Sequence, residues 1–122
     1  MMPTRYIVKD VEESIAFYRD LLGFEVLEQW GPAFAIVNRD DNTLWLSGPD
    51  TSAAKPMPDG TKPVAGGWSR VVVSVDDLDQ LVMGLQALGV KFRNEPLSGP
   101  GGSQVLIEDP SGNPIELFQP RL

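Results

Sequence analysis

The same order of predicted elements occurs twice along this chain, and this repeat limits the folds open to it. Asp10 is a predicted helix N-cap in the first copy, and Asp77 holds the same position in the second. Gly23 and Gly89 follow the two helices, where a C-cap glycine is expected. One β-prone run precedes each helix and three follow it. The sequence therefore predicts an α+β fold of two β-α-β-β-β repeats.

The predicted elements occupy most of the 122 residues. In the first copy they are a strand at 5–8, a helix at 11–22, and strands at 24–30, 33–39 and 43–47. In the second copy they are a strand at 70–75, a helix at 78–88, and strands at 90–93, 104–108 and 114–118. We expect one domain over 1–122, with repeat 1 at about 3–48, a linker at 49–67 and repeat 2 at about 68–120. A linker this long is usually functional or mobile.

Each repeat leaves one face of its sheet uncovered. The helix covers one face of the four strands, and the other face needs a second repeat, a partner chain or a ligand. Two repeats side by side are expected to form a cupped mixed sheet that encloses a trough. Such a concave surface is where a small-molecule site is expected.

Histidine and cysteine are both missing from the sequence. A disulfide or a thiolate metal site is thereby ruled out, and any catalytic proposal must use carboxylates, Tyr, Lys or Arg. The apolar content of 42% is sufficient for a core, and no apolar run approaches the roughly 20 residues of a membrane span. A strand-like segment begins near Thr4, so we expect no signal peptide, no membrane partner and a cytoplasmic location.

The charge balance argues against a nucleic-acid partner. There are 10 basic and 17 acidic residues, for a formal net charge of −7, and no basic stripe is visible. The acidity is explained by solubility, with attraction of a cationic ligand as the alternative.

Two stretches resemble a known superfamily. Residues 11–24 (VEESIAFYRDLLGF) and 109–117 (DPSGNPIEL) are similar to the first-helix and last-hairpin signatures of the vicinal oxygen chelate superfamily, which holds glyoxalases, extradiol dioxygenases and bleomycin-resistance proteins. The repeat extends this resemblance over almost the whole chain. It implies the glyoxalase/bleomycin-resistance fold, whereas it says little about a reaction because the superfamily hosts many chemistries.

The resemblance also bears on metal binding. Metal-using members hold a divalent ion with residues, typically His and Glu, on the first and fourth strands of each repeat. The matching positions here fall near Pro3 and on Trp45, Arg70 and Glu116, and only Glu116 is a metal-ligand type. One carboxylate beside an arginine does not make a site that requires three or four ligands. We therefore expect no metal ion and no other cofactor, as in the metal-free branch that includes the bleomycin-resistance proteins.

Tryptophan, which offers a flat surface for stacking, dominates the candidate ligand-binding residues. The full set is Trp30, Trp45, Ser47, Trp68, Arg70, Glu116 and Phe118. Arg70 and Glu116 are expected to face each other, either to orient a polar ligand or as a salt bridge left from a lost metal site. The tryptophans could instead fill a core or an interface. Phe34 is a weaker candidate, and the Gly-rich segment 97–102 is expected to be a hairpin loop.

The predicted function is metal-independent binding of an aromatic or hydrophobic small molecule by a homodimer. In the metal-free relatives the ligand is a toxic compound held in clefts at a dimer interface, which implies sequestration of an antibiotic or toxic metabolite without a catalytic residue. One alternative is a lyase or isomerase that uses Glu116 as its base. Another is an accessory module that only dimerises or docks onto a protein, with its trough filled by side chains.

Overall fold

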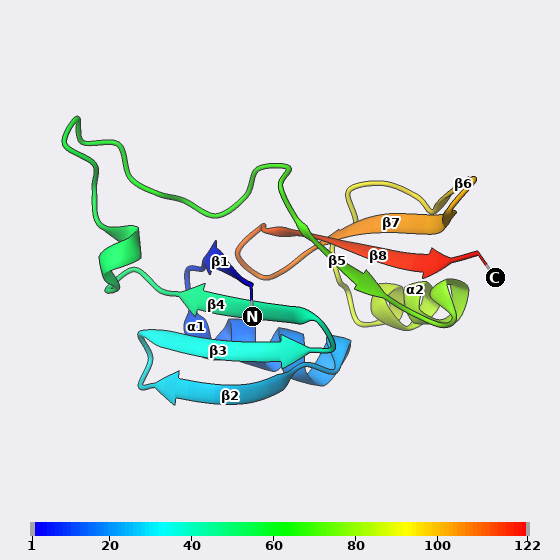
Figure 1. Cartoon of the computed structure of the whole chain (residues 1–122), viewed down its shortest axis with the longest axis horizontal. Helices are drawn as coiled ribbons and strands as arrows, with labels where there is room; N and C mark the ends of the chain where they lie inside the picture. Colours follow the sequence, from blue (N-terminus) through cyan, green and yellow to red (C-terminus); the bar gives the residue numbers. More distant parts are fainter. Residues whose placement is uncertain (1, 122) are drawn as a thin grey trace. The chain divides into compact units, whose positions relative to one another are not determined.

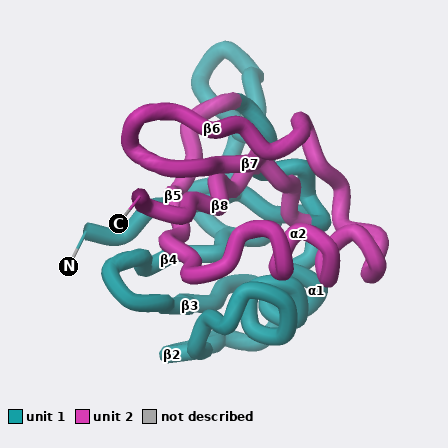
Figure 2. Tube along the Cα trace, turned by 90° about the vertical axis from the view of Figure 1, so that its right-hand side faces the viewer, with its two compact units in different colours: residues 1–67, 110–113 teal, residues 68–109, 114–122 magenta. Residues whose placement is uncertain are grey.

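The chain forms two compact units in this computed structural model, which describes residues 2–121 (Figures 1 and 2). Unit 1 comprises Met1–Gly67 with the turn Pro110–Asn113, and unit 2 comprises Trp68–Asp109 with Pro114–Leu122. The boundary near residue 67 coincides with the predicted start of repeat 2. The single-domain assignment stays a prediction.

Unit 1 is a four-stranded mixed sheet with a helix. Its elements are β1 (Pro3–Ile7), α1 (Val11–Ala16), a π-helical segment η1 (Phe17–Leu21), β2 (Glu25–Trp30), β3 (Phe34–Arg39) and β4 (Asn42–Ser47). The strand order is β1-β4-β3-β2, with β1 parallel to β4 and the other pairs antiparallel.

Unit 2 repeats this topology. Its elements are β5 (Val71–Ser74), α2 (Leu78–Ala87), β6 (Leu97–Gly99), β7 (Gly102–Glu108) and β8 (Pro114–Pro120). The order is β5-β8-β7-β6, again with the first strand parallel to the last. The predicted α+β fold of two β-α-β-β-β repeats is therefore confirmed.

The predicted helix caps are present in both units. Asp10 Oδ1 accepts a hydrogen bond from the Glu13 amide at 3.0 Å, and Asp77 Oδ1 accepts one from the Gln80 amide at 3.1 Å. Each bond satisfies an amide that lacks a partner inside its helix. Gly23, with φ of 73°, provides the left-handed conformation that ends the first helix.

The core of unit 1 lies between α1 and one face of the sheet (Figure 1). Ala35 and Val37 of β3 are fully buried, as are Leu44 and Leu46 of β4. Because side chains alternate along a strand, the residues between them point to the opposite face. That face carries the candidate site.

One predicted strand is wrong. Residues 90–93 form only an isolated bridge, Phe92 to Ile107, and the second strand of unit 2 is β6 instead. The Asn94 side chain accepts the Leu106 amide at 2.9 Å, and Pro96 has no amide to donate, so the ladder is interrupted between the bridge and β6. The segment 97–102, expected as a hairpin loop, contains β6 and the turn into β7.

The linker 49–67 contains little regular structure beyond a short 3₁₀ helix, η2 (Ser52–Ala54). It is held at its end, where the Gly66 amide donates to Asn113 Oδ1 at 2.9 Å. Asn113 Nδ2 in turn donates to the Ile7 carbonyl at 2.9 Å. The turn before β8 therefore fastens the end of the linker to β1.

Within residues 2–121, none of the helices combines the length and the apolar character needed to cross a membrane.

Candidate functional site

A pocket opens in unit 1 on the sheet face that the helix leaves uncovered. Its volume is about 430 Å³. It is lined by Arg5, Trp30, Ala33, Phe34, Ile36, Trp45, Thr51 and Ser52. These residues come from all four strands or their ends and from the start of the linker, so the linker contributes to the pocket wall.

Three aromatic side chains form the wall of this pocket. The ring centroids of Trp30 and Phe34 lie 5.4 Å apart, and those of Phe34 and Trp45 lie 6.2 Å apart at 72°. Sheet register produces this cluster, since Trp30 pairs with Phe34 across β2 and β3. The structure therefore brings the predicted Trp30 and Trp45 together. It adds Phe34, which the sequence made a weaker candidate.

Arg5 is the charged residue of the pocket, and the sequence did not reveal it. It lies opposite Trp45 in the parallel β1–β4 ladder, with its guanidinium carbon 5.0 Å from the Trp45 ring centroid. Its Nη1 donates to Ser47 Oγ at 3.2 Å. Ser47, which was predicted to bind ligand, is fully buried and contacts the guanidinium instead of lining the pocket.

The indole nitrogen of Trp45 has no hydrogen-bond partner. It is the only buried side-chain nitrogen or oxygen in the described part of the chain for which this is so. A buried donor without a partner costs about 1–3 kcal/mol.

In unit 2, Arg70 and Glu116 form an ion pair, as expected from the sequence. Nη2 and Nε of Arg70 lie 2.8 Å and 3.1 Å from Glu116 Oε1. Only 11% of the Glu116 side chain is exposed, compared with 28% of Arg70. Across residues 2–121, no group of three or more acidic, His or Cys side chains could hold a metal ion. The guanidinium occupies the one carboxylate at these positions, so they do not fit a divalent cation.

Trp68 of unit 2 lies under a second arginine. The guanidinium carbon of Arg93 is 4.7 Å from the Trp68 ring centroid, and Arg93 Nε donates to Glu108 Oε2 at 2.8 Å. The Trp68 side chain remains mostly exposed. It lines neither pocket described here.

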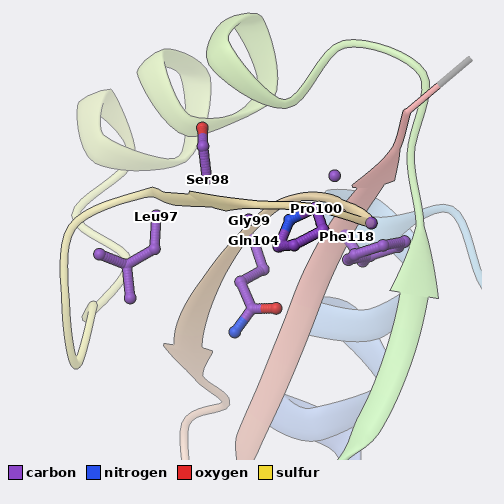
Figure 3. Close-up of a pocket in the computed structure, with 8 residues that line it drawn as sticks. Leu97, Ser98, Gly99, Pro100, Gln104 and Phe118 are labelled. Carbon is purple, nitrogen blue, oxygen red and sulfur yellow. The ribbon is translucent and has the colours of Figure 1, made fainter.

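Phe118 lines a smaller pocket of unit 2, of about 300 Å³ (Figure 3). The rest of the wall consists of Gln104 and the β6–β7 hairpin, 97–102. This hairpin is fastened by Arg121, whose amide donates to the Gly101 carbonyl at 2.9 Å. The pocket corresponds by topology to that of unit 1, since both lie at the hairpin between the second and third strands of a repeat.

The seven predicted ligand-binding residues thus fall into two groups. Unit 1 contains Trp30, Trp45 and Ser47, and unit 2 contains Trp68, Arg70, Glu116 and Phe118. Their roles in ligand binding stay predictions.

A family model matches nearly the whole chain. Residues 2–117 match the glyoxalase family, described as the glyoxalase/bleomycin resistance protein/dioxygenase superfamily. Among curated proteins, the chain is 31% identical to mitochondrial methylmalonyl-CoA epimerase from Bos taurus, over 92% of this chain and 69% of that protein. It is 27% identical to a bleomycin resistance protein from Geobacillus stearothermophilus, over 92% and 90% of the two chains.

Solved structures show the same fold. TnmS3, an antibiotic-binding protein from Streptomyces sp. CB03234, aligns with a TM-score of 0.73 and 29% identity, over 98% of this chain and 93% of that one. A superfamily member from Sphaerobacter thermophilus aligns with a TM-score of 0.76 and 27% identity, over 98% and 95% of the two chains.

Proposed function

Since the chain belongs to the glyoxalase/bleomycin resistance protein/dioxygenase superfamily, we propose that it binds an aromatic small molecule without a metal ion and sequesters it. The observation that carries this proposal is the aromatic wall of the unit 1 pocket, formed by Trp30, Phe34 and Trp45. Flat aromatic side chains stack on flat ligands at little entropic cost. The pocket volume of about 430 Å³ also lies within the roughly 300–1,000 Å³ of small-molecule sites.

The relatives favour an antibiotic or a similar toxic compound as the ligand. They include bleomycin resistance proteins and an antibiotic-binding protein, each at 27–29% identity over more than nine-tenths of this chain. Sequestration requires tight binding and no reaction. A pocket of aromatic side chains without a catalytic group is consistent with that role.

We propose that the unit 2 residues serve ligand binding within their own unit. There Trp68 and Phe118 offer aromatic surface, and the Arg70–Glu116 pair offers polar groups. We further propose that the protein acts as a homodimer. Large apolar side chains remain exposed, among them Trp68 at 69% and Leu97 at 57%, and a second copy of the chain would cover some of them. Sedimentation velocity of the purified protein tests this assignment.

An enzyme is the second candidate, because the relatives include methylmalonyl-CoA epimerase at 31% identity. In that case Glu116 would be the base. Its Oε1 is occupied by Arg70, whereas Oε2 accepts no hydrogen bond from any described residue. Turnover of methylmalonyl-CoA that survives chelation and disappears in Glu116→Gln would establish this function and displace the binding proposal.

The first experiment is a fluorescence titration. Metal-stripped protein is titrated with aromatic antibiotics and flavin-like compounds while tryptophan emission is recorded. Saturable quenching with a micromolar or tighter constant, weakened in Trp45→Ala, supports the proposal. A flat response and an unchanged melting temperature across the whole panel would instead indicate an accessory module that binds no small molecule.

A further inference from the structure

One arginine stacks on a tryptophan in each unit, but their surroundings differ in charge. In unit 2, Arg93 over Trp68 is neutralised by Glu108, whose Oε2 lies 2.8 Å away. In unit 1, Arg5 over Trp45 takes part in none of the ion pairs formed among residues 2–121. The pocket arginine therefore lacks the carboxylate partner that its counterpart has.

The pocket around Arg5 contains no compensating charge. Of the eight residues that line it, Arg5 alone is charged, and the others are apolar, aromatic or hydroxyl-bearing. This arrangement stands out in a chain with a net charge of −7, where acidic side chains outnumber basic ones. The local field at the pocket is therefore set by a cation, although the protein as a whole is an anion.

Arg5 also has hydrogen-bond donors available at this pocket. A guanidinium carries five N–H groups, and the bond to Ser47 uses one of those on Arg5. The seven other residues that line the pocket include no carboxylate to accept from the rest. A ligand with an anionic oxygen would supply such an acceptor.

We propose that the unit 1 pocket selects aromatic molecules bearing an anionic oxygen, such as an aromatic carboxylate or phenolate. The ring lies against the aromatic wall of Trp30, Phe34 and Trp45, and the anionic oxygen accepts from Arg5. This inference rests on the proposed binding function and specifies its ligand class. It disfavours the cationic ligand that overall acidity would suggest, since a cation would meet Arg5 and find no carboxylate in the wall.

The test uses a pair of probes that differ in charge and little else. Binding of 2-naphthoate and of 2-naphthamide to the metal-stripped full-length protein is measured by isothermal titration calorimetry at low ionic strength. A charge-assisted hydrogen bond is roughly twice as strong as a neutral one, so naphthoate is expected to bind about tenfold more tightly. Added salt should reduce this preference, because Arg5 is partly open to solvent.

Matched variants locate the effect. Arg5→Gln removes the pocket cation and is expected to abolish the preference for naphthoate. Arg19→Gln removes the same charge from an exposed residue that pairs with Asp20 and does not line the pocket, so the preference should remain. Trp45→Ala removes part of the aromatic wall and should weaken both probes severalfold while preserving their ratio.

The outcomes separate this inference from the function on which it rests. A preference that is lost in Arg5→Gln and kept in Arg19→Gln supports the anionic ligand class. Equal binding of both probes, or a preference lost equally in the two arginine variants, overturns it and leaves the binding function intact. No binding of either probe overturns both. Unchanged affinities in Trp45→Ala would show that the ring does not bind at this aromatic wall and would overturn the inference.

Discussion

Nη2 of Arg70 lies 2.8 Å from Oε1 of Glu116, so the two groups neutralise each other on the uncovered face of the unit 2 sheet. Metal-using members of the superfamily place their metal ligands at four positions, which fall here near Pro3 and on Trp45, Arg70 and Glu116. Of these, only Glu116 is a residue type that binds metal ions. Arg70, at another of those positions, supplies the positive charge that a metal ion would otherwise bring. The negative charge of Glu116 is therefore balanced without a metal ion.

Removing one member of this pair should destabilise the protein. Glu116→Leu leaves the Arg70 guanidinium half-buried without its partner, and we expect a loss of about 1–3 kcal/mol in the free energy of unfolding. The double variant Arg70→Met/Glu116→Leu removes both charges and should recover most of that loss. Urea denaturation of the three proteins measures both effects. Additive losses would show that the two side chains are not coupled.

Divalent cations should have no effect on stability. A ligand that binds only the folded state raises the free energy of unfolding in proportion to the logarithm of its concentration. Because Arg70 occupies the carboxylate of Glu116, Mg²⁺, Mn²⁺ and Zn²⁺ are expected to leave the melting temperature unchanged. Differential scanning fluorimetry after chelation and dialysis measures this. A rise in melting temperature that Glu116→Gln abolishes would show that Glu116 binds the cation despite its ion pair with Arg70.

The parts of the fold that could be predicted from sequence are those set by local signals. Asp10 and Asp77 cap helices through amides only three residues away, so spacing along the chain identifies them. The error at 90–93 arose from a distant partner. The β7 strand bonds to the Asn94 side chain directly after the predicted strand, and no local pattern reveals that bond.

At the candidate site, too, some residues could be predicted from the sequence and others depended on distant partners. Trp30 and Trp45 could be selected by residue type, because tryptophan is unusual and suited to stacking. Arg5 could not, since its place beside Trp45 follows from the parallel pairing of β1 with β4, the first and last strands of the unit. A known register would have identified it, because paired residues lie on the same face.

Trp30 should contribute to binding without contributing to stability. Its side chain is 66% exposed, so Trp30→Ala exposes little new apolar surface, and we expect the free energy of unfolding to change by no more than about 0.5 kcal/mol. The same substitution removes one pocket wall and should weaken an aromatic ligand by about tenfold, as hot-spot tryptophans do. Calorimetry and urea denaturation measure the two effects.

Leu88→Ala, at an equally exposed residue just after α2, is the control and should change neither quantity. A large stability loss in Trp30→Ala would mean that this tryptophan serves packing.

Gly102 should be the glycine least tolerant of substitution in unit 2. Its φ of 151° lies in a region that other residues rarely adopt, and an added Cβ would collide with the Gln119 carbonyl on the paired strand β8. Backbone cannot move aside as a flexible side chain can, so we expect Gly102→Ala to cost more than about 2 kcal/mol. Gly99, in the same hairpin, has open space at its Cβ position, and Gly99→Ala should change stability by less than about 1 kcal/mol. Urea denaturation of the two variants compares them. Equally small losses would show that the β6–β7 hairpin tolerates a Cβ at both positions. In that case the close approach of β8 does not fix the shape of the smaller pocket.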